Sequence, residues 1–136
     1  MYPAEIVMPM KEQLTSNGFE DLTSIEKVDE ALKKEGTTLV MINSVCGCAA
    51  GAARPGVLQS LTGDKKPDNL TTVFAGFDID AVTRVREYLQ PFPPSSPAVA
   101  LFKDGELVHM LERHHIEDYS AEAIAENLKA AYEEFV

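Results

Sequence analysis

The chain has 136 residues, of which 45% are hydrophobic and 25% are charged, and these values are ordinary for one globular domain. The 12 basic and 22 acidic residues give a formal net charge of −10, which disfavours nucleic acid as a partner because phosphate backbones attract basic surfaces. No apolar run approaches the roughly 20 residues of a membrane span and no signal peptide opens the chain, so we expect a cytoplasmic protein with no membrane partner.

The first part of the chain is predicted to be a helical extension, over about residues 9–36. Pro9 is expected near the start of a helix over residues 10–17, because a proline is tolerated at the first helical position. Thr23 and Glu26 have the spacing of a capping box, in which the side chains of both residues satisfy free backbone groups. A second helix is therefore expected to begin at this point.

The central part of the chain is predicted to alternate strands and helices. Residues 38–45 carry apolar side chains on both faces, which is typical of a strand in the middle of a covered sheet. A helix is expected over about residues 48–61, with a kink or break near Pro55. A second apolar strand over residues 71–77 and a helix over residues 81–90 follow.

The last part of the chain is predicted to contain a hairpin and a final helix. The proline-rich residues 91–97 are expected to form a rigid connection. Strands over residues 98–103 and 106–112 then flank Asp104-Gly105, a preferred two-residue hairpin turn. Ser120 is expected to cap the last helix, which has apolar residues along one face.

The order of these elements predicts the fold class. A strand–helix–strand unit calls for a right-handed parallel crossover, whereas the hairpin adds antiparallel strands. We therefore expect one α/β domain over residues 1–136, in which a mixed central β-sheet is flanked by helices on both faces. This is the thioredoxin-like architecture.

Cys46 and Cys48 are the only cysteines, and Gly47 separates them. They lie where a strand is expected to end and a helix to begin. The positive end of a helix dipole lowers the pKa of a cysteine and favours the reactive thiolate. Gly47 is expected to make the turn by adopting a positive φ. In a reducing compartment, so close a pair is more often catalytic or metal-binding than structural, and it indicates thiol–disulfide chemistry.

Two segments resemble thioredoxins. The first is the strand, cysteine turn and helix start just described. The second is residues 96–106, Ser-Pro-Ala-Val-Ala-Leu-Phe-Lys-Asp-Gly-Glu, which resembles the thioredoxin segment of a cis-proline followed by an apolar strand and a hairpin. In that fold the proline lies against the cysteines and its neighbouring backbone pairs with substrate. The resemblance implies that Gly47, Ser96 and Pro97 bind substrate and that the Ser96–Pro97 bond is cis.

Residues 43–56, Asn-Ser-Val-Cys-Gly-Cys-Ala-Ala-Gly-Ala-Ala-Arg-Pro-Gly, are similar to the signature of the bacilliredoxin family. The match extends over nearly the whole chain, through residues 64–68, 74–76, 93–97 and 112–114. Bacilliredoxins are bacterial proteins with a thioredoxin-like fold and a Cys-Gly-Cys motif. The resemblance implies reduction of mixed disulfides between proteins and the low-molecular-weight thiol bacillithiol, with a weaker disulfide isomerase activity. It implies bacillithiol as co-substrate, bacillithiolated or disulfide-containing proteins as partners, and no bound cofactor.

The same resemblance implies that Cys46 is the nucleophile and that Cys48 is either the resolving thiol or a spectator. No lysine, arginine or histidine flanks Cys46 in sequence, so the helix dipole and backbone amides are the expected stabilisers of its thiolate. The preceding strand lacks the buried acid that thioredoxins carry, and no carboxylate base is assigned. A ring closed over one intervening residue is expected to be strained and more oxidising than the disulfide of thioredoxin.

Three alternative interpretations compete with this one. The spacing Cys-x5-Arg from Cys48 to Arg54 is that of a tyrosine-phosphatase loop, although the usual flanking His and Ser/Thr are missing. The cysteines could bind a metal with His109, His114 or His115, but no spacing links them and adjacent histidines on a strand point to opposite faces. Surface or capping histidines, and no metal, are therefore expected. A non-enzymatic binding module with incidental buried thiols is the third alternative.

Overall fold

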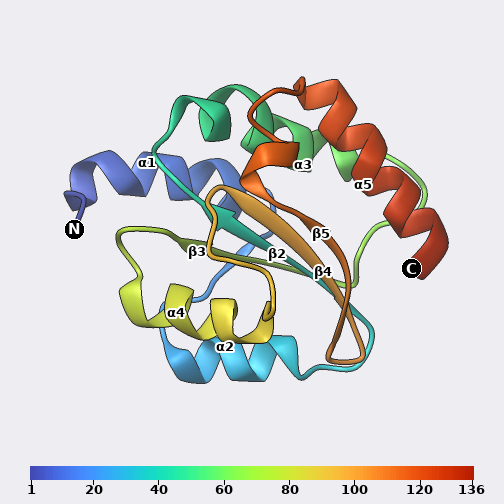
Figure 1. Ribbon diagram of the computed structural model, residues 1–136, viewed down its shortest axis with the longest axis horizontal. Coiled ribbons are helices and arrows are strands. Elements are labelled where there is room, and N and C mark those ends of the chain that lie inside the picture. The colour runs from blue at the N-terminus through green and yellow to red at the C-terminus, as the bar shows by residue number, and fades with distance from the viewer.

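A mixed five-stranded sheet lies at the centre of the computed structural model, which describes residues 1–136 (Figure 1). The spatial order of the strands is β1-β3-β2-β4-β5. β3 pairs in parallel with β1 and β2, whereas β4 is antiparallel to both β2 and β5. The expected mixed sheet is thus confirmed. The strands are β1 (Glu20–Asp21), β2 (Thr37–Asn43), β3 (Asn69–Phe74), β4 (Ala98–Lys103) and β5 (Glu106–Leu111).

Helices cover both faces of this sheet, as expected. α3 and α5 pack together over one face, and α2 and α4 pack together over the other (Figure 1). No helix is long and apolar enough to cross a membrane. The helices are α1 (Ala4–Thr15), α2 (Ile25–Leu32), α3 (Arg54–Ser60), α4 (Ile79–Tyr88) and α5 (Ala121–Phe135), with a π-helical turn η1 (Ala49–Ala53) and a 3-10 turn η2 (Arg113–His115).

The central strand β2 is buried along its whole length and divides the core in two. Leu39 and Met41 belong to the apolar cluster beneath α3 and α5, whereas Val40 and Ile42 belong to the cluster beneath α2 and α4. Successive strand residues point to opposite faces, so a strand that is covered on both sides needs apolar side chains at consecutive positions, as at residues 39–42. This is the physical reason for the uninterrupted apolar run in the sequence.

The N-terminal segment differs in detail from the expected helical extension over about residues 9–36. The first helix begins at Ala4, and Pro9 lies inside it rather than at its start. The proline removes one helical hydrogen bond, but burial of residues such as Leu14 against the sheet offsets that loss. Ser24, rather than Thr23, caps the second helix, because its hydroxyl accepts a hydrogen bond from the backbone of the third helical residue. The segment also contributes β1 to the sheet.

The helix after the cysteines is not broken near Pro55, so of the kink or break expected there the structure excludes the break. The backbone is helical from residue 47 to residue 60, and η1 immediately precedes α3. In this wider turn the N–H of Arg54 bonds to the carbonyl of Ala49, five residues earlier. The π-helical turn therefore accommodates the proline without interrupting the helix.

The hairpin and the last helix agree with the sequence prediction. Asp104 and Gly105 both have positive φ, at 51° and 83°, as the favoured two-residue turn requires. Ser120 caps α5, and its hydroxyl accepts a hydrogen bond from the N–H of Ala123 at 3.1 Å. β4 pairs antiparallel with β2, and Ala98 lies opposite Ile42. The proline-rich segment that precedes β4 therefore lies beside the end of β2.

Candidate active site

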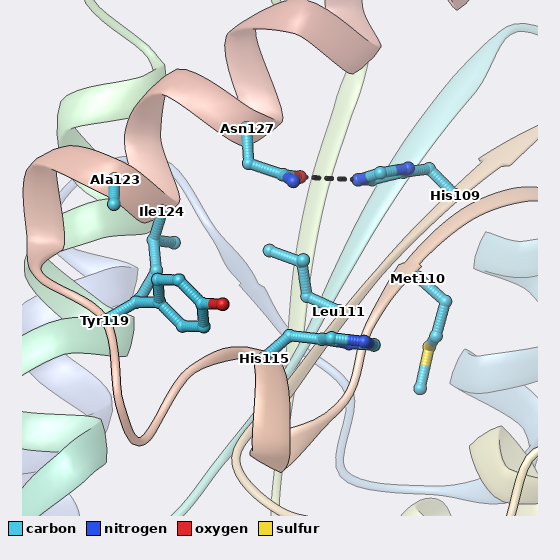
Figure 2. A pocket seen from close by; sticks show the side chains of 8 residues that line it. All are labelled: His109, Met110, Leu111, His115, Tyr119, Ala123, Ile124 and Asn127. Carbon is cyan, nitrogen blue, oxygen red and sulfur yellow. Dashed lines mark hydrogen bonds between the residues drawn. The ribbon is translucent and has the colours of Figure 1, made fainter.

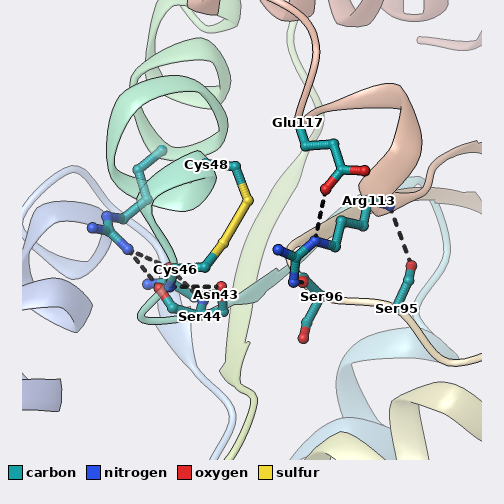
Figure 3. The surroundings of a disulfide bond; sticks show 9 residues. Asn43, Ser44, Cys46, Cys48, Ser95, Ser96, Arg113 and Glu117 are labelled. Atoms are coloured by element: carbon teal, nitrogen blue, oxygen red, sulfur yellow. Dashed lines mark hydrogen bonds and ion pairs between the residues drawn. A yellow bond between two sulfur atoms is a disulfide. The ribbon is translucent and has the colours of Figure 1, made fainter.

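Cys46 and Cys48 lie between the end of β2 and the start of the following helix, and they form a disulfide (Figure 3). Their Cα atoms are 5.5 Å apart. The carbonyl of Cys46 accepts hydrogen bonds from the amides of Ala49 at 3.0 Å and Ala50 at 3.3 Å, so the helix begins directly after Cys46. Both cysteines are half-buried. Cys46 thus occupies the helix N-terminus, where the helix dipole favours a thiolate.

Gly47 does not make the turn through a positive φ, and that expectation was wrong. The glycines with positive φ lie elsewhere in the chain, and Gly47 has helical backbone geometry. A Cβ atom at this position would have no heavy atom within 4 Å. The helical backbone itself brings the two cysteines close together, and any L residue can adopt it. The exposed Gly47 therefore leaves the approach to the cysteines open.

Arg54 is buried directly behind the cysteine loop, with only 2% of its surface exposed. Its Nη1 donates hydrogen bonds to the Oδ1 of Asn43 and the carbonyl of Ser44, both at 2.9 Å, and its Nε donates to Gln13. The Ser44 hydroxyl in turn accepts a hydrogen bond from the N–H of Cys46 at 3.4 Å. Burial lowers the pKa of Arg54, but a guanidinium remains protonated in proteins. Because all its partners are neutral, Arg54 places an unneutralised positive charge beneath the loop.

This position of Arg54 contradicts the phosphatase interpretation. In a phosphatase loop the arginine must offer two parallel N–H groups to a bound phosphate. Here the Nε and Nη1 of Arg54 are bound to oxygens of the protein itself. The Cys-x5-Arg spacing instead reflects a structural contact between the helix and the loop that holds Cys46.

The three histidines share neither a cavity nor a ligand cluster with the cysteines. His109 binds Asn127 at 2.7 Å in a cavity of about 410 Å³ between β5 and α5 (Figure 2). His114 and His115 lie in η2, just after the second strand of the hairpin, and form a small ligand cluster with Glu112. The Nδ1 of His115 accepts a hydrogen bond from the backbone N–H of Glu112 at 3.0 Å. The capping role expected for a histidine is therefore confirmed at His115.

Cys46 opens into a second cavity of about 260 Å³, where several segments of the chain meet. The Ser96–Pro97 bond beside it is cis, as predicted, and a second cis bond joins Gln90 to Pro91. Of the predicted site residues, the cavity brings together Cys46 and Ser96, whereas Gly47, Cys48 and Pro97 do not line it. The lining residues are Tyr2, Ser44, Val45, Cys46, Ala75, Gly76, Arg86, Ser96 and Arg113.

Arg86 and Arg113 line this cavity, and sequence reasoning missed both. Arg113 extends from η2 toward the cysteine loop, donating to the Ser96 carbonyl at 3.2 Å and to Glu117 at 3.1 Å (Figure 3). Arg86 has no acidic partner, its Nε is buried without a hydrogen bond, and burial lowers its pKa. Residues 112–114 belong to the family resemblance, but no motif connects either arginine with the cysteines.

The comparison with known sequences finds relatives along nearly the whole chain. The sequence profile of the family described as "Disulphide isomerase" matches residues 2–136. A protein of Cytophaga hutchinsonii named bacilliredoxin is 58% identical over 134 residues, covering 98% of this chain and 99% of the relative. A bacilliredoxin of Halalkalibacterium halodurans is 52% identical and covers 98% of this chain and 93% of the relative. The predicted full-length resemblance is therefore confirmed.

Solved structures confirm the thioredoxin-like fold. The oxidised thioredoxin from Plasmodium falciparum has a TM-score of 0.58 and 21% identity, and the match covers 84% of this chain and 97% of that one. Mitochondrial thioredoxin 3 from Saccharomyces cerevisiae has a TM-score of 0.57 and 15% identity, covering 90% and 99% of the two chains. These structures establish the fold, and the bacilliredoxin relatives establish a thiol–disulfide oxidoreductase rather than a non-enzymatic module. Such redox proteins act on thiols and on proteins that contain disulfides.

Proposed function

The chain belongs to the bacilliredoxin family, and we propose that this thiol–disulfide oxidoreductase reduces mixed disulfides between proteins and the low-molecular-weight thiol bacillithiol. The observation that carries this proposal is the half-buried Cys46–Cys48 pair at a helix start, beside a small cavity that Ser96 also lines. Bacillithiol is the co-substrate and the protein holds no cofactor. A reactive cysteine pair also suits the reducing cytoplasm, where we place the protein.

Cys46 is the proposed nucleophile. Its thiolate attacks the bacillithiol sulfur of the mixed disulfide, a Cys46–bacillithiol disulfide forms, and the target cysteine leaves as a thiolate that takes up a proton. Cys48 then attacks the Sγ of Cys46, so that the Cys46–Cys48 disulfide forms and bacillithiol leaves. The two cysteines thus lose two electrons, which a thiol reductant in solution restores. The Cα separation of 5.5 Å supports Cys48 as the resolving thiol, because it is ordinary for a disulfide.

Ser96 and Gly47 are the proposed contact points for the target protein. The backbone of Ser96, next to the cis bond, would pair with the chain that carries the mixed disulfide. The hydrogen bond from Arg113 to the Ser96 carbonyl holds this segment in place. Gly47 is exposed and has no side chain, so a bulky protein substrate can approach Cys46. Pro97 is buried and fixes the direction of the segment.

Two positive sources favour the Cys46 thiolate. The helix begins directly after Cys46, so the positive end of the helix dipole lies at this cysteine. Arg54 adds a full charge from behind, and its field is strong because burial reduces screening by water. Arg54 acts through the loop without touching the substrate, so it is a positioning residue. We expect the reduced protein to have a Cys46 pKa below the ordinary value of about 8.5.

A trapping experiment tests the proposal. The Cys48→Ala variant is incubated with a target protein that carries bacillithiol, and the products are identified by mass spectrometry. We expect bacillithiol bound to Cys46 and free target protein, because the resolving thiol is absent. The matched Cys46→Ala variant should form no adduct, and an adduct there would contradict the assignment of the nucleophile.

Disulfide isomerase activity is the second candidate function, and the family description favours it. It would use the same cysteines, but Cys46 would form its mixed disulfide with the target protein. In the trapping experiment, a covalent complex between Cys46 and the target would support this alternative over reduction of bacillithiol mixed disulfides.

A further inference from the structure

Three of the four arginines in the chain gather around Cys46. Arg54 lies beneath the loop, and Arg86 and Arg113 line the cavity into which Cys46 opens. No aspartate or glutamate lines that cavity. In a chain with 22 acidic and 12 basic residues, so positive a setting indicates a site for a negatively charged group.

Arg86 lacks the partners that its neighbour on α4 has. Arg84 binds Asp29 at 2.7 Å and Glu87 at 3.4 Å, so its charge is compensated within the protein. Arg86 has no carboxylate within reach, and its Nε is buried without a hydrogen bond. An unpaired buried donor is unfavourable, and a bound anion would relieve this cost.

Arg113 is the second arginine of the cavity, and it keeps donors free although Glu117 compensates part of its charge. It donates through Nε to Glu117 and through Nη1 to the Ser96 carbonyl. A guanidinium has five N–H groups, so one on Nη1 and two on Nη2 remain for a ligand. Two hydrogen bonds therefore hold Arg113 in place beside the cavity and leave its other N–H groups free to bind a ligand.

We propose that Arg86 and Arg113 form a carboxylate-binding subsite that recognises the anionic part of the low-molecular-weight thiol while its sulfur reacts with Cys46. The inference rests on the proposed function and specifies its substrate as a small thiol that carries carboxylates. Charge-assisted hydrogen bonds from two arginines favour such a ligand, and the same charges disfavour a cationic thiol. The subsite thus selects the thiol, while Ser96 and the loop contact the protein.

The test compares mixed disulfides that differ only in charge. One target protein with a single cysteine is modified in turn with mercaptosuccinate, which is anionic, 2-mercaptoethanol, which is neutral, and cysteamine, which is cationic. The measured quantity is kcat/KM for release of the target thiol by the full-length protein. We expect the mercaptosuccinate adduct to exceed the neutral one by about tenfold or more, and the cationic one to be slowest.

Variants then assign the preference to the two arginines. Arg86→Met and Arg113→Met should each lower the anionic-to-neutral ratio by about tenfold, because one charge-assisted contact is lost. Arg113 also holds the Ser96 carbonyl, so its removal can slow the reaction with every adduct. The anionic-to-neutral ratio of kcat/KM is therefore the measured quantity, because a general loss of activity does not change it. Arg86→Lys keeps the charge and should retain much of the preference. Arg84→Met, which removes an equal charge from the same helix outside the cavity, should leave the ratio unchanged.

The outcomes separate the two proposals. Equal kcat/KM values for the three adducts would overturn the subsite and leave mixed-disulfide reduction intact. A preference that survives both Arg86→Met and Arg113→Met would also overturn the subsite. Failure to release the target from all three adducts and from a bacillithiol adduct of the same target would overturn the proposed function together with the subsite.

Discussion

Lys11 and Arg54 are the two cations that the protein buries, with 4% and 2% of their surface exposed, but the partners of each differ in charge. The ammonium of Lys11 lies 2.9 Å from the carboxylates of both Asp21 and Asp78. The guanidinium of Arg54 contacts only neutral oxygens. The charge of Lys11 is neutralised by its two carboxylate partners, whereas the charge of Arg54 remains and acts on the groups around it. We infer that Lys11 serves stability and that Arg54 serves the cysteine site.

The pKa shifts of Lys11 and Arg54 have opposite directions, in agreement with the difference between their partners. Burial alone would lower the pKa of Lys11, but hydrogen bonds to Asp78 and Asp21 outweigh it and raise the pKa. Burial lowers the pKa of Arg54, and no acidic partner opposes that effect. A buried cation without a counter-ion is unfavourable in the resting protein. Its field, however, favours a thiolate over a thiol at Cys46.

Removal of Lys11 is expected to have the largest effect on stability. Lys11→Met leaves two carboxylates without their cation, one of them almost fully buried, and should reduce the free energy of unfolding by about 3–5 kcal/mol. Urea denaturation measures this loss. The pKa of Cys46 in the folded variant should stay unchanged, and a shift there would contradict the division of roles.

Removal of Arg54 should change the pKa of Cys46 and should reduce stability less than removal of Lys11 does. Arg54→Met should raise the pKa of Cys46 by about one unit, because the buried charge that favours the thiolate is lost. The ultraviolet absorbance of the thiolate, followed during a pH titration of the reduced protein, measures this shift. The variant should also lose about 1–3 kcal/mol of stability, since the Ser44 carbonyl loses its donor and the Oδ1 of Asn43 keeps only the N–H of Ser44. An unchanged Cys46 pKa would show that Arg54 is only structural.

The reduction potential provides a related test. A stabilised thiolate and a ring closed over one residue both make a disulfide more oxidising, so the potential should lie above thioredoxin's value of about −270 mV. At a pH above both Cys46 pKa values, Arg54→Met should lower it by about 30 mV, which corresponds to the same tenfold change in equilibrium constant. Equilibration with a dithiol buffer measures both values. A wild-type potential below that of thioredoxin would contradict this expectation.

Substitution of Gly47 should have the smallest effect on stability. It tests the backbone geometry of the cysteine loop without changing any charge near Cys46. Gly47→Ala should raise the free energy of unfolding by about 0.5–1 kcal/mol, because the position is helical and open. The Cys46 pKa should not change, since the helix start and Arg54 remain. Gly56→Ala is the matched control in the same helix: its Cβ would lie 2.8 Å from Ile124, so destabilisation is expected. A destabilised Gly47→Ala protein would contradict the helical assignment.

Local signals in the sequence predicted most of the fold. The β2 run is apolar because both faces of that strand are covered, and Asp104-Gly105 carries its turn preference in two residues. The Cys-Gly-Cys motif and the Ser96–Pro97 segment likewise identified the fold family and the cysteine site. Such features need no knowledge of distant contacts.

The errors arose where tertiary contacts override local preference. Pro9 lies inside a helix because the surrounding residues pack against the sheet, and Gly47 is helical although glycine can turn. Arg86 and Arg113 come from two separate segments that only the fold brings to Cys46. Neither spacing nor composition contains that information.

A single-turnover reaction tests reduction of bacillithiol mixed disulfides most directly. The reduced protein is mixed with a stoichiometric amount of bacillithiol-modified target, and all thiols and disulfides are then mapped by mass spectrometry. We expect one unmodified target, one free bacillithiol and one Cys46–Cys48 disulfide for each turnover. A target that keeps its bacillithiol, or one that becomes linked to Cys46, would contradict this function.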